Sequence, residues 1–254
     1  VGAVHDGAGI AELYGGPAGF GRHLDALFAE PETADERFGG AYGTVIHEQR
    51  EARALRSGMC AISNQPAHHI PFMYAFSDRP WRSAPLVHEL AGRLFAGGHI
   101  GQGFPGDEDN GEMSAWWLWA ALGLYPLELG SGELRIGAPL LDDVTVRRAG
   151  GGTLRVLARR QVPQAQFLVS ARLDGEALTA PVLPLAALTG ATHRVLELEF
   201  SASAADAARS PLWQRQAEPV AAWHPDLTGP AAGVAAGVAV GVAEEHVVRL
   251  DVAV

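Results

Sequence analysis

The stretch that decides the fold runs from Gly103 to Tyr125 and reads GFPGDEDNGEMSAWWLWAALGLY. Three consecutive acidic residues lie in a loop rich in Gly and Pro, and the aromatic, apolar run after them predicts a helix that follows Asn110 and ends at Gly123. Aromatic rings stack on the apolar faces of a pyranose, while carboxylates move protons or hold a divalent cation. The combination therefore suits a site that cleaves sugars.

Asp107 and Asp109 admit two interpretations. Acidic side chains just before a helix favour the positive end of its dipole and cap its free amides, which requires no ligand. Alternatively, residues i and i+2 of an extended loop point to the same side, so both carboxylates could hold one water molecule. An EF-hand is rejected because it needs Gly sixth and Glu twelfth, whereas Gly111 is fifth here and Leu118 twelfth.

The segment from His47 to Glu51 reads HEQRE and differs by one residue from the helical zinc-protease motif, which has His in place of Glu51. The motif therefore argues against a zinc protease. Helical spacing places His47 and Glu51 on one face, with Glu48 alongside. Spacing alone favours a solvated helix face over a site.

A second polar segment runs from Asn64 to Pro71 and reads NQPAHHIP. We expect a helix that begins near Asn64, with Pro66 in its first turn and a kink at Pro71. Adjacent histidines point to different sides of a helix, so we expect one of His68 and His69 to be packed and the other to face a site. The aromatic residues that follow are interpreted as core or cleft wall: Phe72, Tyr74, Phe76 and Trp81.

Composition excludes several classes of function. The net charge is −10, and all 19 basic residues are Arg, which argues against nonspecific nucleic-acid binding. The single cysteine, Cys60, allows no internal disulfide, and its apolar neighbours predict a buried thiol. No apolar run reaches membrane-spanning length. The chain begins at Val1 without a signal peptide, and we expect it to be an internal or C-terminal piece of a longer protein.

Three regions are expected along the chain. Residues 1–130 are predicted to be helical, with helices at Pro17–Glu30 and from Ala84 to Phe95. Residues 131–205 are predicted to form a sheet, and 206–254 a low-complexity tail or additional strands. The tail contains an Ala/Val/Gly tract at 229–242 and a strand-like segment at 246–254. The expected strands of the sheet contain residues 133–136, 144–147, 154–157, 167–170 and 195–200.

Seven motifs, in this order, resemble those of glycoside hydrolase family 92, the calcium-dependent, exo-acting α-mannosidases. The match covers about residues 4–150, and the sixth motif is the most specific. The motifs are VHD at 4–6, ELYGG at 12–16, LDALF at 24–28, IHEQRE at 46–51, NQPAHHIPFMYAFSDRPW at 64–81, GDEDNGEMSAWWLWAALGLYPL at 106–127 and GSGELRIGAPLLDDVTV at 130–146.

The resemblance implies an α+β fold. The family has an N-terminal β-sandwich, an (α/α)6 barrel and a small C-terminal β-module. This chain would then hold the late helices of the barrel, followed by a small antiparallel β-module.

The resemblance also implies roles for individual residues. Asp107 and Asp109 match the carboxylates that position and deprotonate the attacking water, and Glu51 matches a ligand of Ca²⁺. His47 and Glu48 match residues that contact mannose in the cleavage subsite. The full set of expected substrate-binding residues is His47, Glu48, Asn64, His68 and His69.

The function implied is that of an inverting, calcium-dependent α-mannosidase, of α-1,2 specificity, that removes terminal mannose from glycans in N-glycan degradation. Its partner would be a mannose-containing glycan, not nucleic acid, and the bacterial parent protein would be secreted, periplasmic or on the cell surface. The sequence does not decide the linkage preference, for which α-1,2 is the expectation, and it leaves the oligomeric state open.

The sequence departs from the family pattern at three places. The general acid of the family is a Glu in a segment that would precede Val1. Residues 57–62 read SGMCAI in place of Gly-Gln-Tyr-x-His, and Asn110 stands where many members have Cys. Two alternatives therefore stay open: a non-catalytic glycan-binding remnant, and a structural helical domain without a site.

Overall fold

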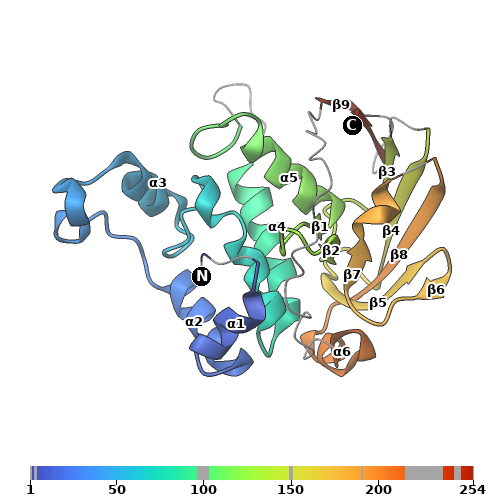
Figure 1. Ribbon diagram of the computed structural model, residues 1–254, viewed down its shortest axis with the longest axis horizontal. Coiled ribbons are helices and arrows are strands. Elements are labelled where there is room, and N and C mark those ends of the chain that lie inside the picture. The colour runs from blue at the N-terminus through green and yellow to red at the C-terminus, as the bar shows by residue number, and fades with distance from the viewer. Residues whose placement is uncertain are drawn as a thin grey trace. The chain divides into compact units, whose positions relative to one another are not determined.

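The computed structural model describes residues 2, 5–95, 103–148, 151–189 and 191–214, together with the backbone of 237–242 and 247–253. The chain divides into two compact units (Figure 1). One comprises Val1–Ser131 and Arg135–Leu140, and the other comprises Gly132–Leu134 and Leu141–Val254. No helix among the described residues is long and apolar enough to cross a membrane.

The first unit is helical apart from β1 (Leu124–Tyr125), which pairs antiparallel with the end of β2 (Glu133–Ile136). Its α-helices are α1 (Gly7–Leu13), α2 (Pro17–Ala29), α3 (His47–Leu55), α4 (Ser83–Leu94) and α5 (Glu112–Leu122). Its short 3-10 helices are η1 (Glu36–Phe38), η2 (Gly40–Tyr42), η3 (Gln65–Ala67), η4 (Ile70–Phe76) and η5 (Pro80–Arg82).

The helices predicted from apolar spacing at α2, α4 and α5 are confirmed. In α2, Pro17 occupies the first turn, where its missing N–H is not needed, and the fully buried Phe20 and Leu24 mark the core face. Helix α5 ends at Gly123, whose φ of 66° lies in the left-handed region that glycine adopts without strain.

The helix expected from Asn64 was wrong, because this segment forms the 3-10 turns η3 and η4 instead. Each turn has a proline near its start, and a proline supplies no N–H for a continuous α-helical ladder. The residue before Pro71 is also biased away from helical geometry. The two prolines therefore divide the segment into two tight turns.

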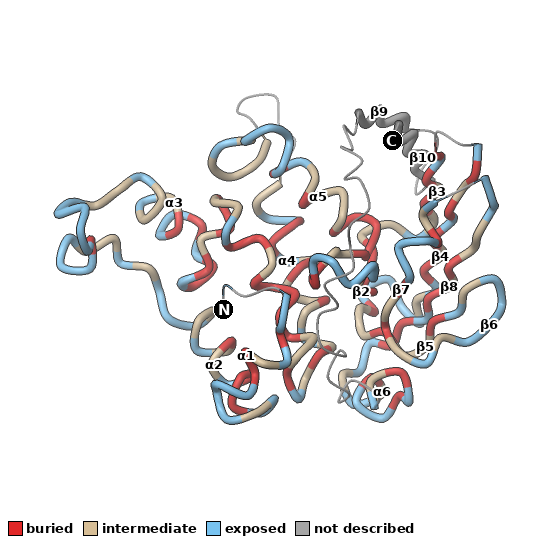
Figure 2. Tube along the Cα trace, in the orientation of Figure 1, coloured by how far each residue is buried: buried red, intermediate tan, exposed pale blue. Residues whose placement is uncertain are grey.

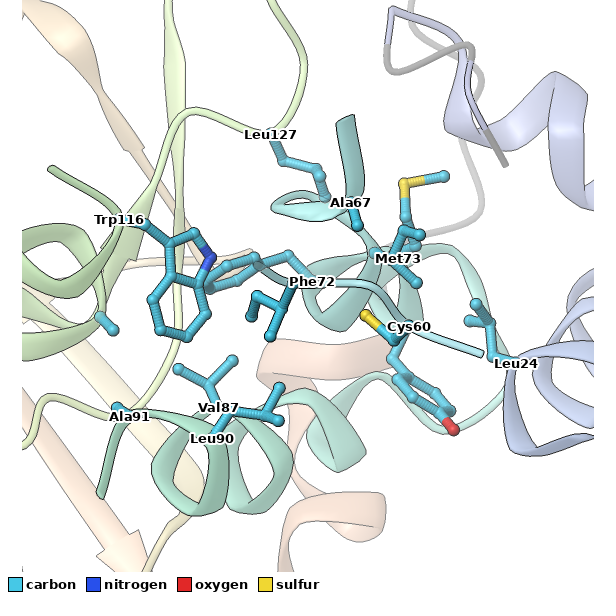
Figure 3. Packing of buried hydrophobic residues seen from close by; sticks show 14 of the residues in the cluster. Leu24, Cys60, Ala67, Phe72, Met73, Val87, Leu90, Ala91, Trp116 and Leu127 are labelled. Atoms are coloured by element: carbon cyan, nitrogen blue, oxygen red, sulfur yellow. The ribbon is translucent and has the colours of Figure 1, made fainter. Parts of the chain in front are cut away.

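The core of the first unit gathers around Trp116, which is 2% exposed. Figure 3 shows Trp116 beside Phe72, Val87 and Leu90. Phe72 stacks on Tyr125 with ring centroids 3.8 Å apart. Large apolar groups from α4, α5 and η4 thus exclude water together and stabilise the unit.

Cys60 is fully buried, as its neighbours predicted. Burial raises the pKa of its thiol to about 12, because the thiolate would lie in apolar surroundings. Cys60 is therefore a packed, unreactive side chain.

A polar network links α2 to η4 and η5. The Tyr74 hydroxyl donates to Asp25 Oδ1 at 2.7 Å, and burial raises the pKa of that phenol. Arg79 and Arg82 lie 2.9 and 3.1 Å from the same carboxylate. The network pairs a carboxylate with two cations and fixes the segment that follows His68 and His69.

The second unit is built on one sheet with the strand order β6-β5-β8-β4-β3-β10-β9. Its strands are β3 (Asp143–Arg148), β4 (Thr153–Arg160), β5 (Phe167–Leu173), β6 (Glu176–Ala177), β8 (His193–Ser201), β9 (Gly237–Val242) and β10 (Val247–Ala253). The unit also contains β7 (Val182–Pro184), η6 (Leu185–Leu188), α6 (Ala204–Arg209) and α7 (Pro211–Gln214).

The expectation of an antiparallel module was wrong in part. β4 pairs with β8 in parallel, and β3 pairs with β10 in parallel, while the other pairs are antiparallel. Parallel neighbours require a crossover, and β5 to η6 fills the chain between β4 and β8. The sheet is therefore mixed.

The five strands predicted from alternating residues are confirmed, and burial alternates along β3 and β4 (Figure 2). Their placement in one sheet was wrong for β2, which belongs to a separate three-stranded sheet. The strand-like segment at 246–254 contains β10, and the Ala/Val/Gly tract contains β9 at its end. The rest of these two segments, residues 229–236, 246 and 254, lies outside the described residues.

Candidate active site

The acidic loop before α5 is a left-handed turn. Asp109, Asn110 and Gly111 have φ values of 47°, 61° and 86°. The left-handed region disfavours residues with a Cβ, although Asn and Asp enter it more readily than others. The loop is therefore not extended at Asp109, so the spacing rule for extended residues does not orient the two aspartates.

The Glu108 side chain, and not that of Asp107 or Asp109, caps the N-terminus of α5. Its Oε1 accepts a hydrogen bond from the Ser114 backbone N–H at 3.1 Å, and its carbonyl accepts from the backbone N–H groups of Glu112 and Met113. These contacts satisfy amides in the first turn of α5. Neither aspartate carboxylate is needed to cap the helix.

The two aspartates differ in their surroundings. Gln65 Nε2 donates to Asp109 Oδ2 at 2.6 Å, and the same nitrogen lies 3.5 Å from the Asp107 carbonyl oxygen. The Asp107 side chain is exposed, and in the described part of the chain no hydrogen bond or ion pair engages its carboxylate. Gln65 therefore engages the Asp109 carboxylate, whereas the Asp107 carboxylate has no such contact.

Gly106 brings the loop against the preceding polar segment. A Cβ at this position would lie 2.2 Å from the Ser63 carbonyl oxygen, so only glycine allows the contact. The φ of 69° at Gly106 also favours glycine. The same two segments meet again at the Gln65–Asp109 hydrogen bond.

His68 is the packed member of the histidine pair. It is 3% exposed, and its carbonyl accepts a hydrogen bond from Trp116 Nε1 at 3.0 Å. Burial lowers the pKa of His68 to about 4 because the charged ring loses hydration. Glu112 Oε1 lies 3.9 Å from Nδ1, but its side chain is 58% exposed, and the distant, solvated carboxylate does not offset burial.

His69 and Asn64 are half-buried. The Asn64 carbonyl accepts the Ala67 backbone N–H at 3.0 Å and closes the turn of η3. Asn64 and His69 therefore flank the turn η3, and each side chain is partly accessible to solvent.

Helix α3 carries the other three expected site residues. His47 is exposed, whereas Glu48 and Glu51 are half-buried. Glu48 Oε2 is buried without a hydrogen bond, and its ion-pair contact is His47 Nδ1 at 3.3 Å. At the N-terminus of α3, Gln49 Oε1 accepts the Ile46 backbone N–H at 3.2 Å.

The structure thus joins some of the expected residues and not others. The two hydrogen bonds from Gln65 and the close approach of Gly106 to Ser63 connect the segment 63–69 to the loop 106–112. Within the described ranges, no hydrogen bond or ion pair connects His47, Glu48 or Glu51 to either segment. A shared cleft for all of these residues stays a prediction.

The binding of Ca²⁺ stays a prediction, and the oxygen donors that α3 offers for it are two glutamates. Glu48 and Glu51 are three residues apart, so both lie on one face of the helix, and the buried Glu48 Oε2 lacks a hydrogen bond. Ca²⁺ takes six to eight oxygen ligands. The described residues contain no group of three or more His, Cys, Asp and Glu side chains able to hold a metal. Carbonyl, water or substrate oxygens would have to complete the shell.

Among the described residues of the first unit, four buried side-chain atoms lack hydrogen-bond partners, and all lie on α3, in the segment 63–69 or in the loop 106–112. Such atoms are costly unless a ligand or an ordered water satisfies them. Three of them lie in the two segments that the Gln65–Asp109 bond joins. The atoms are Glu48 Oε2, Ser63 Oγ, His68 Nε2 and Glu108 Oε2.

Two residues of this arrangement were not predicted as site residues. Gln65 lies inside the quoted NQPAHH motif, but nothing local indicates a partner 44 residues away. Glu108 stands between the two aspartates, and the general preference for acids before a helix applied equally to all three. Only the folded loop distinguishes them.

Comparison with known proteins gives consistent results. The model of the glycosyl hydrolase family 92 catalytic domain matches residues 1–201. A solved family GH92 inverting mannosidase from Bacteroides thetaiotaomicron is 31% identical, with a TM-score of 0.61 over 82% of this chain and 27% of its own. A family GH92 α-mannosidase of the same species, in complex with mannoimidazole, shares the fold at 24% identity, with a TM-score of 0.64 over 81% of this chain and 25% of its own.

A curated relative, called an uncharacterized secreted glycosidase in Arthroderma benhamiae, is 26% identical over 126 residues, which are 48% of this chain and 16% of the relative. The chain therefore spans 16% of the length of the curated relative and 25–27% of the length of the two solved mannosidases. Because the family model covers well over half of the 254 residues, the chain belongs to glycosyl hydrolase family 92.

Proposed function

We propose that this chain supplies the water-activating side of the active site in an inverting α-mannosidase. The observation that carries the proposal is the loop before α5. Glu108 satisfies the helix amides, so Asp107 and Asp109 need no structural partner at the helix terminus. A relative at 31% identity is an inverting mannosidase, which supports the same reaction here.

In this proposal, Asp109 is the general base and Asp107 helps to position the water. An inverting glycosidase needs a base on one face of the sugar and an acid on the other, with the carboxyl groups roughly 6.5–9.5 Å apart. The water attacks the anomeric carbon and gives its proton to the Asp109 carboxylate. The glycosidic bond breaks, and the leaving oxygen takes a proton from the acid, which we place outside this chain.

The substrate half of the proposal uses the remaining predicted residues. We assign His47 and Glu48, and with them the turn residues Asn64 and His69, to contacts with a terminal α-mannose. His68 was also expected to bind substrate, but it is 3% exposed, so we assign it the role of tying this segment to α5 through the hydrogen bond from Trp116 Nε1 to its carbonyl oxygen. We propose an α-1,2 linkage and a role in N-glycan degradation, with the sugar of a glycan as the only partner required.

We propose Ca²⁺ as the cofactor, with Glu51 as a ligand and Glu48 on the same face of α3. When bound, the ion would hold hydroxyl groups of the mannose, since it is a hard cation that prefers oxygen. We also propose that the first unit forms late helices of an (α/α)6 barrel and that the parent protein is secreted. The curated relative is called secreted, which supports the latter.

The test uses the full-length protein that contains this chain and an α-1,2-linked mannobiose. Proton NMR during hydrolysis should show β-mannose before mutarotation, as inversion requires. Asp109→Asn should abolish turnover while largely retaining substrate affinity, because it removes the base and not the sugar contacts. Asp142→Asn, at a side chain of the second unit that is 59% exposed and pairs with Arg160, is the matched control and should retain activity.

Metal dependence is measured in the same assay. Excess EDTA should remove activity and Ca²⁺ should restore it, whereas Zn²⁺ should not. Full activity in EDTA would contradict the calcium proposal. Glycan binding without any turnover by the wild-type protein would instead favour a non-catalytic glycan-binding protein.

A further inference from the structure

Gln65 is the side chain that holds Asp109. Its Nε2 lies 2.6 Å from Asp109 Oδ2, and it also lies 3.5 Å from the Asp107 carbonyl oxygen. The backbone of Gln65 is fixed, because its carbonyl accepts the His68 N–H at 3.0 Å within η3. The amide therefore reaches the loop from a rigid turn.

Asp109 needs such a restraint. It is exposed, and its φ of 47° leads a run of three left-handed residues. A short carboxylate on an exposed loop would otherwise rotate freely between rotamers. With Oδ2 engaged by Gln65, Oδ1 is left in a defined direction, which is what a base needs to accept a proton from a positioned water.

The charges around Asp109 make a neutral amide suitable. Asp107 and Glu108 flank it on the loop, and Glu112 follows on α5. The facing segment 63–69 contributes the neutral Gln65, the half-buried His69 and the buried His68, whose pKa of about 4 keeps it uncharged near neutrality. In the described part of the molecule no Arg forms an ion pair with Asp109. A further carboxylate at residue 65 would add repulsion at hydrogen-bond distance.

We propose that Gln65 is a positioning residue for Asp109, whose amide orients the carboxylate toward the attacking water. This inference rests on the proposed function. It adds a group that touches neither sugar nor water and acts only through Asp109. Its effect should therefore appear in kcat and in the pH profile rather than in substrate affinity.

The experiment compares Gln65→Ala and Gln65→Glu in the full-length protein, with mannobiose as substrate. Gln65→Ala should lower kcat about 10- to 100-fold and change KM less than about threefold, because orientation is lost while sugar contacts stay. Gln65→Glu is isosteric and should move the acid limb of the kcat–pH profile upward by about one pH unit, because two adjacent carboxylates share a proton.

Gln161→Glu makes the same chemical change at an exposed position of the second unit and should match the wild type. Equal melting temperatures would show that the variants fold. A kcat of Gln65→Ala within twofold of wild type, or an unshifted acid limb in Gln65→Glu, overturns the positioning role while mannosidase activity stands. A wild-type protein that releases no mannose overturns the proposed function, and the positioning role with it.

Discussion

At the scale of single residues, burial decides the chemistry of His68. The His68 ring is buried, and this burial lowers its pKa from an ordinary value near 6.5 to about 4. Of two adjacent histidines, only His68 lost its access to water. The half-buried His69 keeps enough exposure to meet a ligand.

The low pKa of His68 predicts a pH-dependent stability. The unfolded chain binds this proton more readily than the folded chain does, so the free energy of unfolding should fall as pH drops from about 6.5 toward 4 and then level off. The loss attributable to His68 is up to about 3 kcal/mol. Urea unfolding between pH 7.5 and 4 measures it.

The uncharged variant His68→Gln should lose this part of the pH dependence. The exposed His193→Gln, in the second unit, is the control and should follow the wild-type curve. If His68→Gln showed the same fall in stability as the wild type, His68 would have to accept its proton without penalty in the folded chain.

At the scale of elements, the approach of the α5 loop to the segment 63–69 depends on Gly106. A methyl group there would lie 2.2 Å from the Ser63 carbonyl oxygen, which belongs to the backbone. Gly106→Ala should therefore separate the two segments and break the Gln65–Asp109 contact. Gly132, with a φ of 70° but nothing within 4 Å of an added Cβ, has the same backbone strain without the clash.

We predict that Gly106→Ala destabilises the full-length protein by about 2 kcal/mol more than Gly132→Ala does, because the added methyl overpacks the contact with Ser63. We also expect it to lower the mannosidase activity of that protein at least about tenfold. Left-handed strain alone costs about 1–2 kcal/mol and is common to both variants. Thermal unfolding and the mannobiose assay measure the two effects. Equal stability and activity of the two variants would show that the loop moves away from Ser63 without consequence.

At the scale of the whole molecule, the chain holds a part of a family 92 catalytic domain, since it covers 25–27% of the solved relatives. We predict that the 254-residue chain alone hydrolyses mannobiose at least about 10²- to 10⁴-fold more slowly than the full-length protein, because that is the usual contribution of a general acid or base.

Both proteins would be assayed at equal molar concentration, with released mannose measured by a coupled enzyme. The Asp109→Asn variant of the full-length protein gives the background. Comparable rates for the chain and the longer protein would show that the acid lies within these 254 residues, and the division of roles proposed above would have to be redrawn.

Local sequence determined the longest helices and strands. Apolar spacing with Pro and Gly boundaries predicted α2, α4 and α5, because a helix needs one apolar face and ends where the backbone allows. Alternation predicted the strands of the second unit for the equivalent reason. The tight turns at Pro66 and Pro71 were missed, because a tolerated first-turn proline and a helix-breaking proline look alike in sequence.

The tertiary structure decided which of these residues meet. It placed Gln65 against Asp109, assigned the helix cap to Glu108, and paired β4 in parallel with β8. In each case several residues of the same type could have made the contact, and the folded chain selected one of them. Propensity acts between neighbours in the chain, whereas burial and hydrogen bonding across 44 residues depend on how the whole unit packs.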